Sequence, residues 1–227
     1  LTYILTKSKL AGVLACTFLA FTPAYLYRTM AGFSDHEAIG MVGFFLAMLG
    51  FVLIMKYLDL IKERRLIVSG IMGLIMGALT IFTILCWGGV GIFLFMIVPI
   101  AFVLFWIMKL KNEKDSIRDN GFLFYLIWIG SSIVLAVLSG MSFSGFLDRY
   151  LFSSTGIIAF AVLGFVIIDR LVLSFGKLIK SYDENDRIKY SISASAVLGM
   201  VALPFLGKNF FSLLWEIVNK LLNPSWG

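Results

Sequence analysis

The sequence predicts an all-α protein with about seven transmembrane helices and one further helix that lies at the membrane surface. The chain is 60% hydrophobic, and its charged residues gather in clusters between long apolar runs. A helix of about 20 apolar residues is long enough to cross a bilayer. These runs lack the alternation of apolar and polar residues that builds a membrane β-barrel. Because backbone polar groups need partners inside lipid, α-helices are the remaining way to cross it.

Each predicted span is an apolar run bounded by polar or turn residues. Basic residues flank the first three runs, and Pro23 near the end of the first run loosens its last turns. Gly73 and Gly77, in the third run, have the spacing that lets a neighbouring helix approach closely. The predicted spans are residues 10–27, 38–55, 66–86, 90–108, 121–140, 151–168 and 190–206.

The connections between the later spans differ in character. Trp87-Gly88-Gly89 predicts a tight turn between the third and fourth spans, whereas residues 109–120 form a hydrophilic connector. The sixth span is expected to end just before Asp169-Arg170. In residues 209–222, polar side chains recur at helical spacing and apolar ones cover the other sides. That pattern is typical of an amphipathic helix at the interface.

The distribution of Lys and Arg predicts the orientation of the spans. Short cytoplasmic loops collect Lys and Arg, and alternate loops of this chain hold most of the 19 basic residues. The other loops hold only Arg28, Arg149, Lys208 and Lys220. We therefore expect the loop of residues 28–37, the turn at Trp87 and the terminal helix on the extracytoplasmic side. The basic set is Lys7, Lys9, Lys56, Lys62, Arg64, Arg65, Lys109, Lys111, Lys114, Arg118, Arg170, Lys177, Lys180, Arg187 and Lys189.

Other residue patterns exclude several classes of protein. The net charge of +6 does not indicate nucleic-acid binding, because no basic stripe interleaved with aromatic residues lies outside the spans. Cys16 and Cys86 sit inside apolar runs and have neither a disulfide nor a metal-binding spacing. We expect no secretory signal peptide, since the chain opens on Leu1 without a basic start or a cleavage pattern.

The loop from Arg28 to Glu37 is the candidate functional site, and two interpretations of it remain open. Ser34 followed by Glu37 fits a capping box at the start of a helix. Alternatively, Asp35 and Glu37 are placed to share a hard cation such as Mg²⁺ or Mn²⁺. Arg28 suits a phosphate by its forked donors, although snorkelling toward headgroups would also explain it. His36 ranks below these neighbours, because a lone histidine at a helix start is usually only solvated.

Residues 27–38 resemble a signature of the catalytic subunit of asparagine-linked oligosaccharyltransferases, especially of the archaeal AglB type. In that family an Arg, a Gly and an Asp-x-Glu motif precede a membrane helix, in the order found here. Trp87-Gly88-Gly89 resembles the family's Trp-Gly-Gly turn, and residues 141–146 resemble its next outer loop more weakly. The spacing of spans matches across nearly the whole chain. The resemblance therefore implies the membrane domain of a GT-C glycosyltransferase.

The resemblance also implies a reaction and a site. Such enzymes transfer an oligosaccharide from a dolichyl phosphate or diphosphate to asparagine in Asn-x-Ser/Thr acceptors, with Mn²⁺ or Mg²⁺ held by acids of several outer loops. By position, Asp35 and Glu37 would be catalytic metal ligands, and Arg28 would assist on the donor phosphate. It further implies an archaeal plasma membrane, with the endoplasmic reticulum as the alternative.

The resemblance covers only part of the family's machinery. The family's earlier acidic motif, its later Glu-bearing loop and its soluble acceptor-binding domain have no counterpart in these residues. We therefore expect a single transmembrane domain, residues 1–227, from the middle of a longer enzyme, or a truncated relative.

Two other functions remain as alternatives. One is a glycosyltransferase of the same architecture that uses a lipid or a Ser or Thr hydroxyl as acceptor. The other is a non-catalytic transporter or assembly subunit in which Ser34 and Glu37 only cap a helix. Transporters place polar residues at the bilayer midplane, whereas these spans are almost free of charge, with Asp169 near an inner end.

Overall fold

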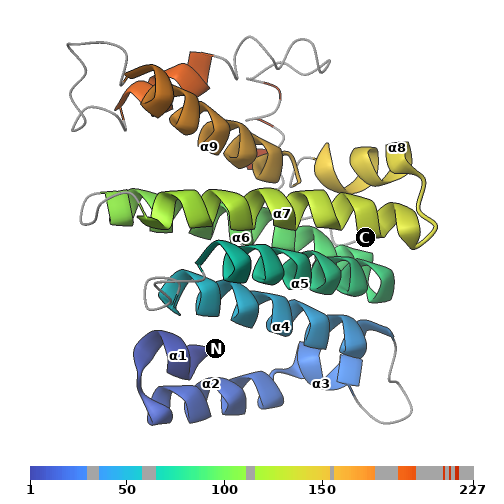
Figure 1. Cartoon of the computed structure of the whole chain (residues 1–227). Coiled ribbons are helices and arrows are strands. Elements are labelled where there is room, and N and C mark those ends of the chain that lie inside the picture. The colour runs from blue at the N-terminus through green and yellow to red at the C-terminus, as the bar shows by residue number, and fades with distance from the viewer. Residues whose placement is uncertain are drawn as a thin grey trace. The chain divides into compact units, whose positions relative to one another are not determined.

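A computed structural model of the chain describes a helical protein (Figure 1). The described residues are 1–29, 36–57, 65–110, 116–153, 156–176 and 189–197, with Ser212, Trp215, Val218 and Asn219. Within these ranges the structure contains helices and no strand. The chain divides into two compact units, Leu1–Leu147 and Asp148–Gly227.

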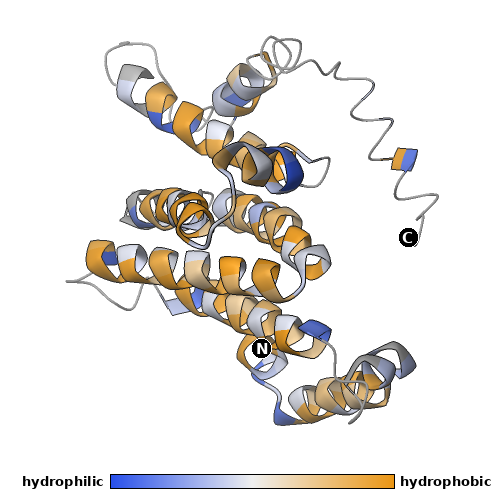
Figure 2. Cartoon of the chain, turned by 90° about the vertical axis from the view of Figure 1, so that its right-hand side faces the viewer, coloured by the Kyte–Doolittle hydropathy of each residue, from blue (hydrophilic) through white to orange (hydrophobic). Residues whose placement is uncertain are grey.

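The first unit is a set of helices, of which four are long and apolar enough to cross a membrane. These four are α4, α5, the part of α6 over Gly88–Trp106 and the part of α7 over Asn120–Leu138, counted over the described residues. Apolar residues predominate along these four helices (Figure 2), as in helices surrounded by lipid and other helices. The unit comprises α1 (Thr2–Thr6), α2 (Lys9–Phe21), α3 (Pro23–Thr29), α4 (His36–Tyr57), α5 (Arg65–Cys86), α6 (Gly88–Leu110), α7 (Ser116–Leu138) and α8 (Phe143–Phe146). The second to fifth predicted spans are thus confirmed as helices.

Helices α5 and α7 are in close contact through the two glycines of α5. A Cβ atom on Gly73 would lie 2.9 Å from the carbonyl oxygen of Phe124, and one on Gly77 would overlap the hydroxyl of Ser131. That hydroxyl donates a hydrogen bond back to the Gly73 carbonyl oxygen, at 3.3 Å. Small residues let membrane helices approach until such contacts form. The close approach predicted from the glycine spacing is therefore confirmed, and α7 is the partner.

A buried polar and aromatic cluster holds α5, α6 and α7 together. The indole of Trp128 donates a hydrogen bond to the hydroxyl of Thr80 at 3.0 Å, and both side chains are fully buried. The Thr80 hydroxyl in turn donates to the carbonyl oxygen of Met76 at 2.7 Å. On its other side the indole stacks on Phe95 of α6, with ring centroids 5.7 Å apart. This cluster gives the bundle directional contacts that lipid cannot replace.

The prediction of one continuous helix over residues 10–27 is wrong. Helix α2 ends at Phe21, Thr22 is extended with φ −67° and ψ 118°, and α3 begins at Pro23. A proline has no backbone N–H to continue the helix, and its ring pushes the preceding residue out of the α conformation. The 13 residues of α2 extend about 20 Å, which is shorter than the roughly 30 Å of bilayer hydrocarbon.

A π-helical turn, η2 (Leu147–Leu151), starts at the last residue of the first unit, and the second unit contains α9 (Ile157–Gly176). The predicted bounds 151–168 are therefore wrong at both ends. At the start, the N–H of Gly156 donates to the hydroxyl of Ser153 at 3.0 Å. A Cβ on Gly156 would overlap the Tyr150 carbonyl oxygen. Because of this tight turn inside an apolar run, α9 begins only at Ile157.

At the other end of α9, Asp169 does not terminate the helix. Its side chain is fully buried and accepts a hydrogen bond from the hydroxyl of Ser191 at 2.8 Å. Ser191 belongs to a helical stretch, residues 189–197, that coincides with the start of the predicted seventh span. The rest of that span lies outside the described residues, as does the predicted surface helix 209–222 apart from the four isolated positions.

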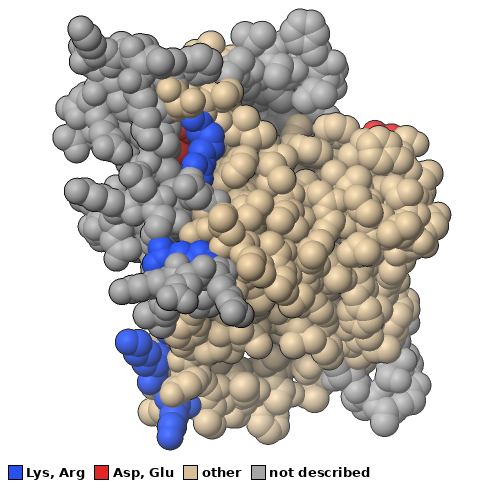
Figure 3. Space-filling model, in the orientation of Figure 1, with Lys and Arg blue, Asp and Glu red and all other residues tan. Residues whose placement is uncertain are grey.

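The Lys and Arg side chains that the structure describes in the first unit lie at one end of its helices (Figure 3). Lys56 is in the last turn of α4, and Arg65 is the first residue of α5. The Lys56 ammonium donates to the backbone carbonyl of Ile4 in α1, next to Lys7. Glu37 lies at the opposite end of α4, about 28 Å from Lys56 along the helix. Lys56 and Arg65 thus lie at the end of the bundle opposite Glu37.

Candidate active-site loop and the turn packed beside it

Glu37 is the part of the candidate loop that the structure describes most fully. It lies in the first turn of α4 and is only 8% exposed, whereas the neighbouring His36 is exposed. A carboxylate in the first turn of a helix is stabilised by the unpaired N–H groups there. Ser34 and Asp35 lie outside the described residues, and Arg28 is described only as part of the backbone of α3.

Trp87 forms the entire connection between α5 and α6. Its N–H donates to the carbonyl oxygen of Thr83 at 2.7 Å, and its own carbonyl accepts from the N–H groups of Val90 and Gly91, both at 3.1 Å. One residue therefore ends α5 and begins α6. Gly88 is the first residue of α6, and Gly89 follows in the same turn. A Cβ on Gly89 would lie 3.3 Å from the indole nitrogen of Trp87.

The Trp87 connection packs directly on the first turns of α4. A Cβ atom on Gly40 would lie 2.8 Å from the Cβ of Trp87, and one on Gly43 would lie 2.6 Å from the hydroxyl of Thr83. Gly40 follows Glu37 by three residues, so the two lie on the same side of the helix. The structure thus brings Glu37 and Trp87 to adjacent parts of one surface. The Gly40-x-x-Gly43 spacing is the signal in the sequence that could have indicated this contact.

A third connection of the first unit lies at this end. Helices α5 and α7 run parallel, because Gly73 lies against Phe124 and Ile127 while Gly77 lies against Ser131. The residues after α7 therefore emerge at the same end as Trp87. There the hydroxyl of Ser142 accepts the N–H of Gly145 at 3.2 Å, capping the short α8. Phe146 at the end of α8 is buried, with its ring edge toward Phe95 at a centroid distance of 6.3 Å.

Among the described residues at this end, Glu37 is the carboxylate that could contribute to a cation site. Mg²⁺ and Mn²⁺ prefer oxygen ligands, and Mg²⁺ needs six around it. Glu37 supplies a carboxylate at the start of α4. In the part of the chain that the structure describes, His, Cys, Asp and Glu side chains do not gather in groups of three or more that could hold a metal ion.

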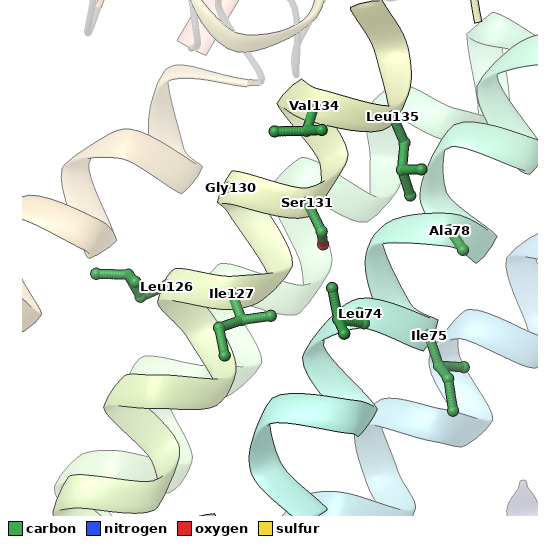
Figure 4. A pocket seen from close by; sticks show the side chains of 9 residues that line it. All are labelled: Leu74, Ile75, Ala78, Leu126, Ile127, Gly130, Ser131, Val134 and Leu135. Carbon is green, nitrogen blue, oxygen red and sulfur yellow. The ribbon is translucent and has the colours of Figure 1, made fainter. Parts of the chain in front are cut away.

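The bundle also has an apolar groove of about 670 Å³ between α5 and α7, away from the charged ends (Figure 4). Leu74, Ile75 and Ala78 line it from α5, and Gly130 and Ser131 lie on the facing side of α7. The hydroxyl of Ser131 points toward α5 and is held by the backbone of Gly73 and Trp128. Its lining carries no charged group to orient a substrate.

Comparison with known proteins identifies the family. No curated protein and no solved structure matches the chain. A family model described as "Oligosaccharyl transferase STT3, N-terminal" matches residues 1–219, which is nearly the whole chain of 227 residues. Members of this family are membrane glycosyltransferases of protein N-glycosylation, in agreement with the four apolar helices found here. The chain therefore belongs to the oligosaccharyl transferase STT3 family.

Proposed function

We propose that this chain supplies part of the membrane active site of an enzyme that transfers an oligosaccharide from a dolichyl phosphate or diphosphate to asparagine in Asn-x-Ser/Thr acceptors. The family match supports the reaction class. The observation that supports the location is Glu37, a carboxylate held nearly buried in the first turn of α4 beside the Trp87 connection. A single buried acid at a membrane surface, supported by a neighbouring turn, is suited to a fixed role in a site.

In this proposal Asp35 and Glu37 hold Mn²⁺ or Mg²⁺ together with ligands from other loops, water or substrate phosphates. The bound ion supplies Lewis-acid stabilisation of the charge that develops on the leaving phosphate. Burial and the N-terminal end of α4 keep the Glu37 carboxylate in one orientation. Arg28 binds the donor phosphate through its guanidinium, which matches phosphate geometry better than an ammonium does. His36 has no assigned step.

The site is proposed to face the extracytoplasmic side of the membrane. The Lys and Arg side chains described in the first unit lie at its end opposite Glu37, and short cytoplasmic loops are rich in Lys and Arg. On this orientation the acceptor polypeptide and the sugar meet outside the cytoplasm. An archaeal plasma membrane is the setting that the sequence resemblance favours.

The test compares three variants of the full-length enzyme, with a lipid-linked oligosaccharide and an Asn-x-Thr peptide. Asp35→Ala and Glu37→Gln are expected to lower glycopeptide formation by 100-fold or more, within the range that loss of one transition-state contact gives. The Mn²⁺ concentration that gives half of the maximal residual activity should be higher in both variants than in the wild type. The control is His36→Ala, which alters an exposed neighbour in the same loop.

Normal turnover of Asp35→Ala at limiting Mn²⁺ would refute the metal assignment. Hydroxyl acceptors, either lipid or Ser and Thr peptides, should be inert in the same assay. Transfer to them in preference to asparagine would replace the proposed acceptor.

A further inference from the structure

The structure holds a second and larger groove, on the opposite side of α4 from its contact with α5. It has a volume of about 1150 Å³ and is bordered by α1, α2 and the middle of α4. None of the residues of α1 or α2 is buried, so these two helices pack only lightly on the rest of the unit. The residues that line it are Leu1, Thr2, Tyr3, Lys9, Gly12, Val13, Ala15, Cys16, Thr17, Leu19, Val42, Phe45, Leu46 and Leu49.

Helix α1 keeps this groove open. On one side Tyr3 packs on α2, where a Cβ on Gly12 would lie 3.3 Å from the Cβ of Tyr3. On the other side the Ile4 carbonyl accepts a hydrogen bond from Lys56 of α4. The short helix is thus fixed to both neighbours at the basic end and separates them. Beyond it, α2 and α4 face each other across open space.

The chemistry of the lining is that of one charged group above a hydrocarbon surface. Lys9 is the charged residue in the lining, and it lies at the N-terminal end of α2. The hydroxyl of Thr17 donates to the carbonyl oxygen of Val13 at 3.0 Å and so offers little to a ligand. Lys7 and Lys56 lie at the same end of the unit, whereas Glu37 is at the other end of α4.

The length of the groove matches the depth of one leaflet of a bilayer. From Lys9 to Leu19 the lining of α2 extends about 15 Å, at 1.5 Å per residue. This is half of the roughly 30 Å of bilayer hydrocarbon, and therefore the thickness of one leaflet. The lining residues of α4 lie near the middle of that helix. A chain with its headgroup at Lys9 would reach the middle of the bilayer there.

We propose that this groove binds an anionic phospholipid from the leaflet at the Lys-rich end of the protein. Its phosphate lies at the Lys9 ammonium, and one acyl chain packs between α2 and α4 against Val13, Phe45 and Leu46. The lipid fills the space between α2 and α4 that α1 opens. This site is separate from the Glu37 end of the bundle and does not depend on the reaction proposed there.

The test measures lipid selectivity in the full-length protein, in vesicles that contain phosphatidylcholine with a minor fraction of spin-labelled phosphatidylglycerol or spin-labelled phosphatidylcholine. The wild type should immobilise labelled phosphatidylglycerol in preference to labelled phosphatidylcholine. Lys9→Gln should reduce this preference about fivefold, the contribution of one Lys near an anionic surface. Lys9→Arg should retain it. Lys7→Gln is the matched control, because Lys7 is a neighbouring exposed lysine that does not line the groove.

A second pair of variants tests the hydrocarbon part of the site. Ala15→Trp fills the groove and should lower the immobilised fraction of both labelled lipids. Ala20→Trp places the same side chain at an exposed position of α2 outside the groove and should leave that fraction unchanged. Equal selectivity in wild type and Lys9→Gln, or equal effects of the two tryptophans, would overturn the proposal.

A photoactivatable reagent on Cys16 identifies the occupant directly, in protein whose other cysteines, Cys86 among them, are replaced by alanine. Cys16 is a free thiol that lines the groove. The expected adduct is a phospholipid. An adduct to a polypeptide, from a second copy or another part of the full chain, would show that a protein segment occupies the groove and would refute the lipid site.

Discussion

Gly40 of α4 lies directly against Trp87, which occupies the space that a side chain at position 40 would need. A Cβ on Gly40 would be 2.8 Å from the Cβ of Trp87 and 3.4 Å from its backbone nitrogen. The Cβ and backbone atoms of Trp87 cannot move aside as the end of a flexible side chain can. The position of Glu37, one turn earlier on α4, is therefore coupled to the connection between α5 and α6.

Gly40→Ala should push α4 away from Trp87 and shift Glu37. Overpacking of this kind costs about 1–3 kcal/mol, and we expect a lower thermal midpoint together with reduced glycopeptide formation. Gly50→Ala in the same helix is the control, since its Cβ would approach only the end of Met72, at 3.9 Å. If both variants behave alike, the Gly40 contact does not position the site.

Gly77→Ala should loosen the contact between α5 and α7, because its methyl group would overlap the hydroxyl of Ser131. The expected loss is again about 1–3 kcal/mol, measured as a lower unfolding temperature in detergent. Gly130→Ala in α7 provides the comparison, as nothing lies within 4 Å of its Cβ position. That substitution should be neutral or slightly stabilising, because alanine favours helices over glycine. An unchanged midpoint for Gly77→Ala would contradict the packing described here.

The hydrogen bond between Trp128 and Thr80 is open to a double-mutant cycle. Thr80→Val and Trp128→Phe each remove one partner of the 3.0 Å bond, and the double variant corrects for their separate effects on packing. We expect a coupling energy of about 0.6 kcal/mol, with about 1.7 kcal/mol as the upper bound for interhelical bonds in membranes. Strict additivity of the two substitutions would show that the bond does not contribute.

Ser191→Ala should weaken the attachment of residues 189–197 to α9, because it removes the donor to buried Asp169. The net cost of such a bond is about 0.5–1.5 kcal/mol. Amide hydrogen exchange over 189–197 should accelerate in this variant. Ser195→Ala is the control, since the Ser195 hydroxyl donates only to the carbonyl of Ser191 in its own helix. Faster exchange in both variants would point to a general loss of helix stability instead.

The pattern of apolar runs predicted the parts of the fold that depend on composition alone. The spans matched by α4, α5, α6 and α7 are long and apolar, and Pro99 inside α6 does not end that helix, so length and hydropathy suffice to find them. The family resemblance, confirmed at the level of the family, rested on motif order along the chain. The predictions failed where local backbone geometry competes with hydropathy, at Pro23 and at Gly156.

The site was less accessible to sequence analysis than the spans. Residue order indicated that Glu37 and Trp87 share one face of the membrane, but not that Gly40 joins them, because that contact depends on how α4 crosses the end of α5. The role of Glu37 and the metal remain predictions, and Asp35 and the side chain of Arg28 lie outside the described residues. Hydropathy also could not show that α9 continues past Asp169 with that side chain buried. The burial depends on a hydrogen bond from Ser191, which is 22 residues away in the sequence.

Because Trp87 alone connects α5 to α6, this connection cannot absorb an inserted or deleted residue. Successive residues of a helix are rotated by about 100°, so one residue inserted beside Trp87 would turn α6 by that angle. Leu94, Phe95 and Val98, which now lie fully buried, would then leave the interior of the bundle. Insertions and deletions at this corner of the molecule would therefore have to be matched by a rebuilt core.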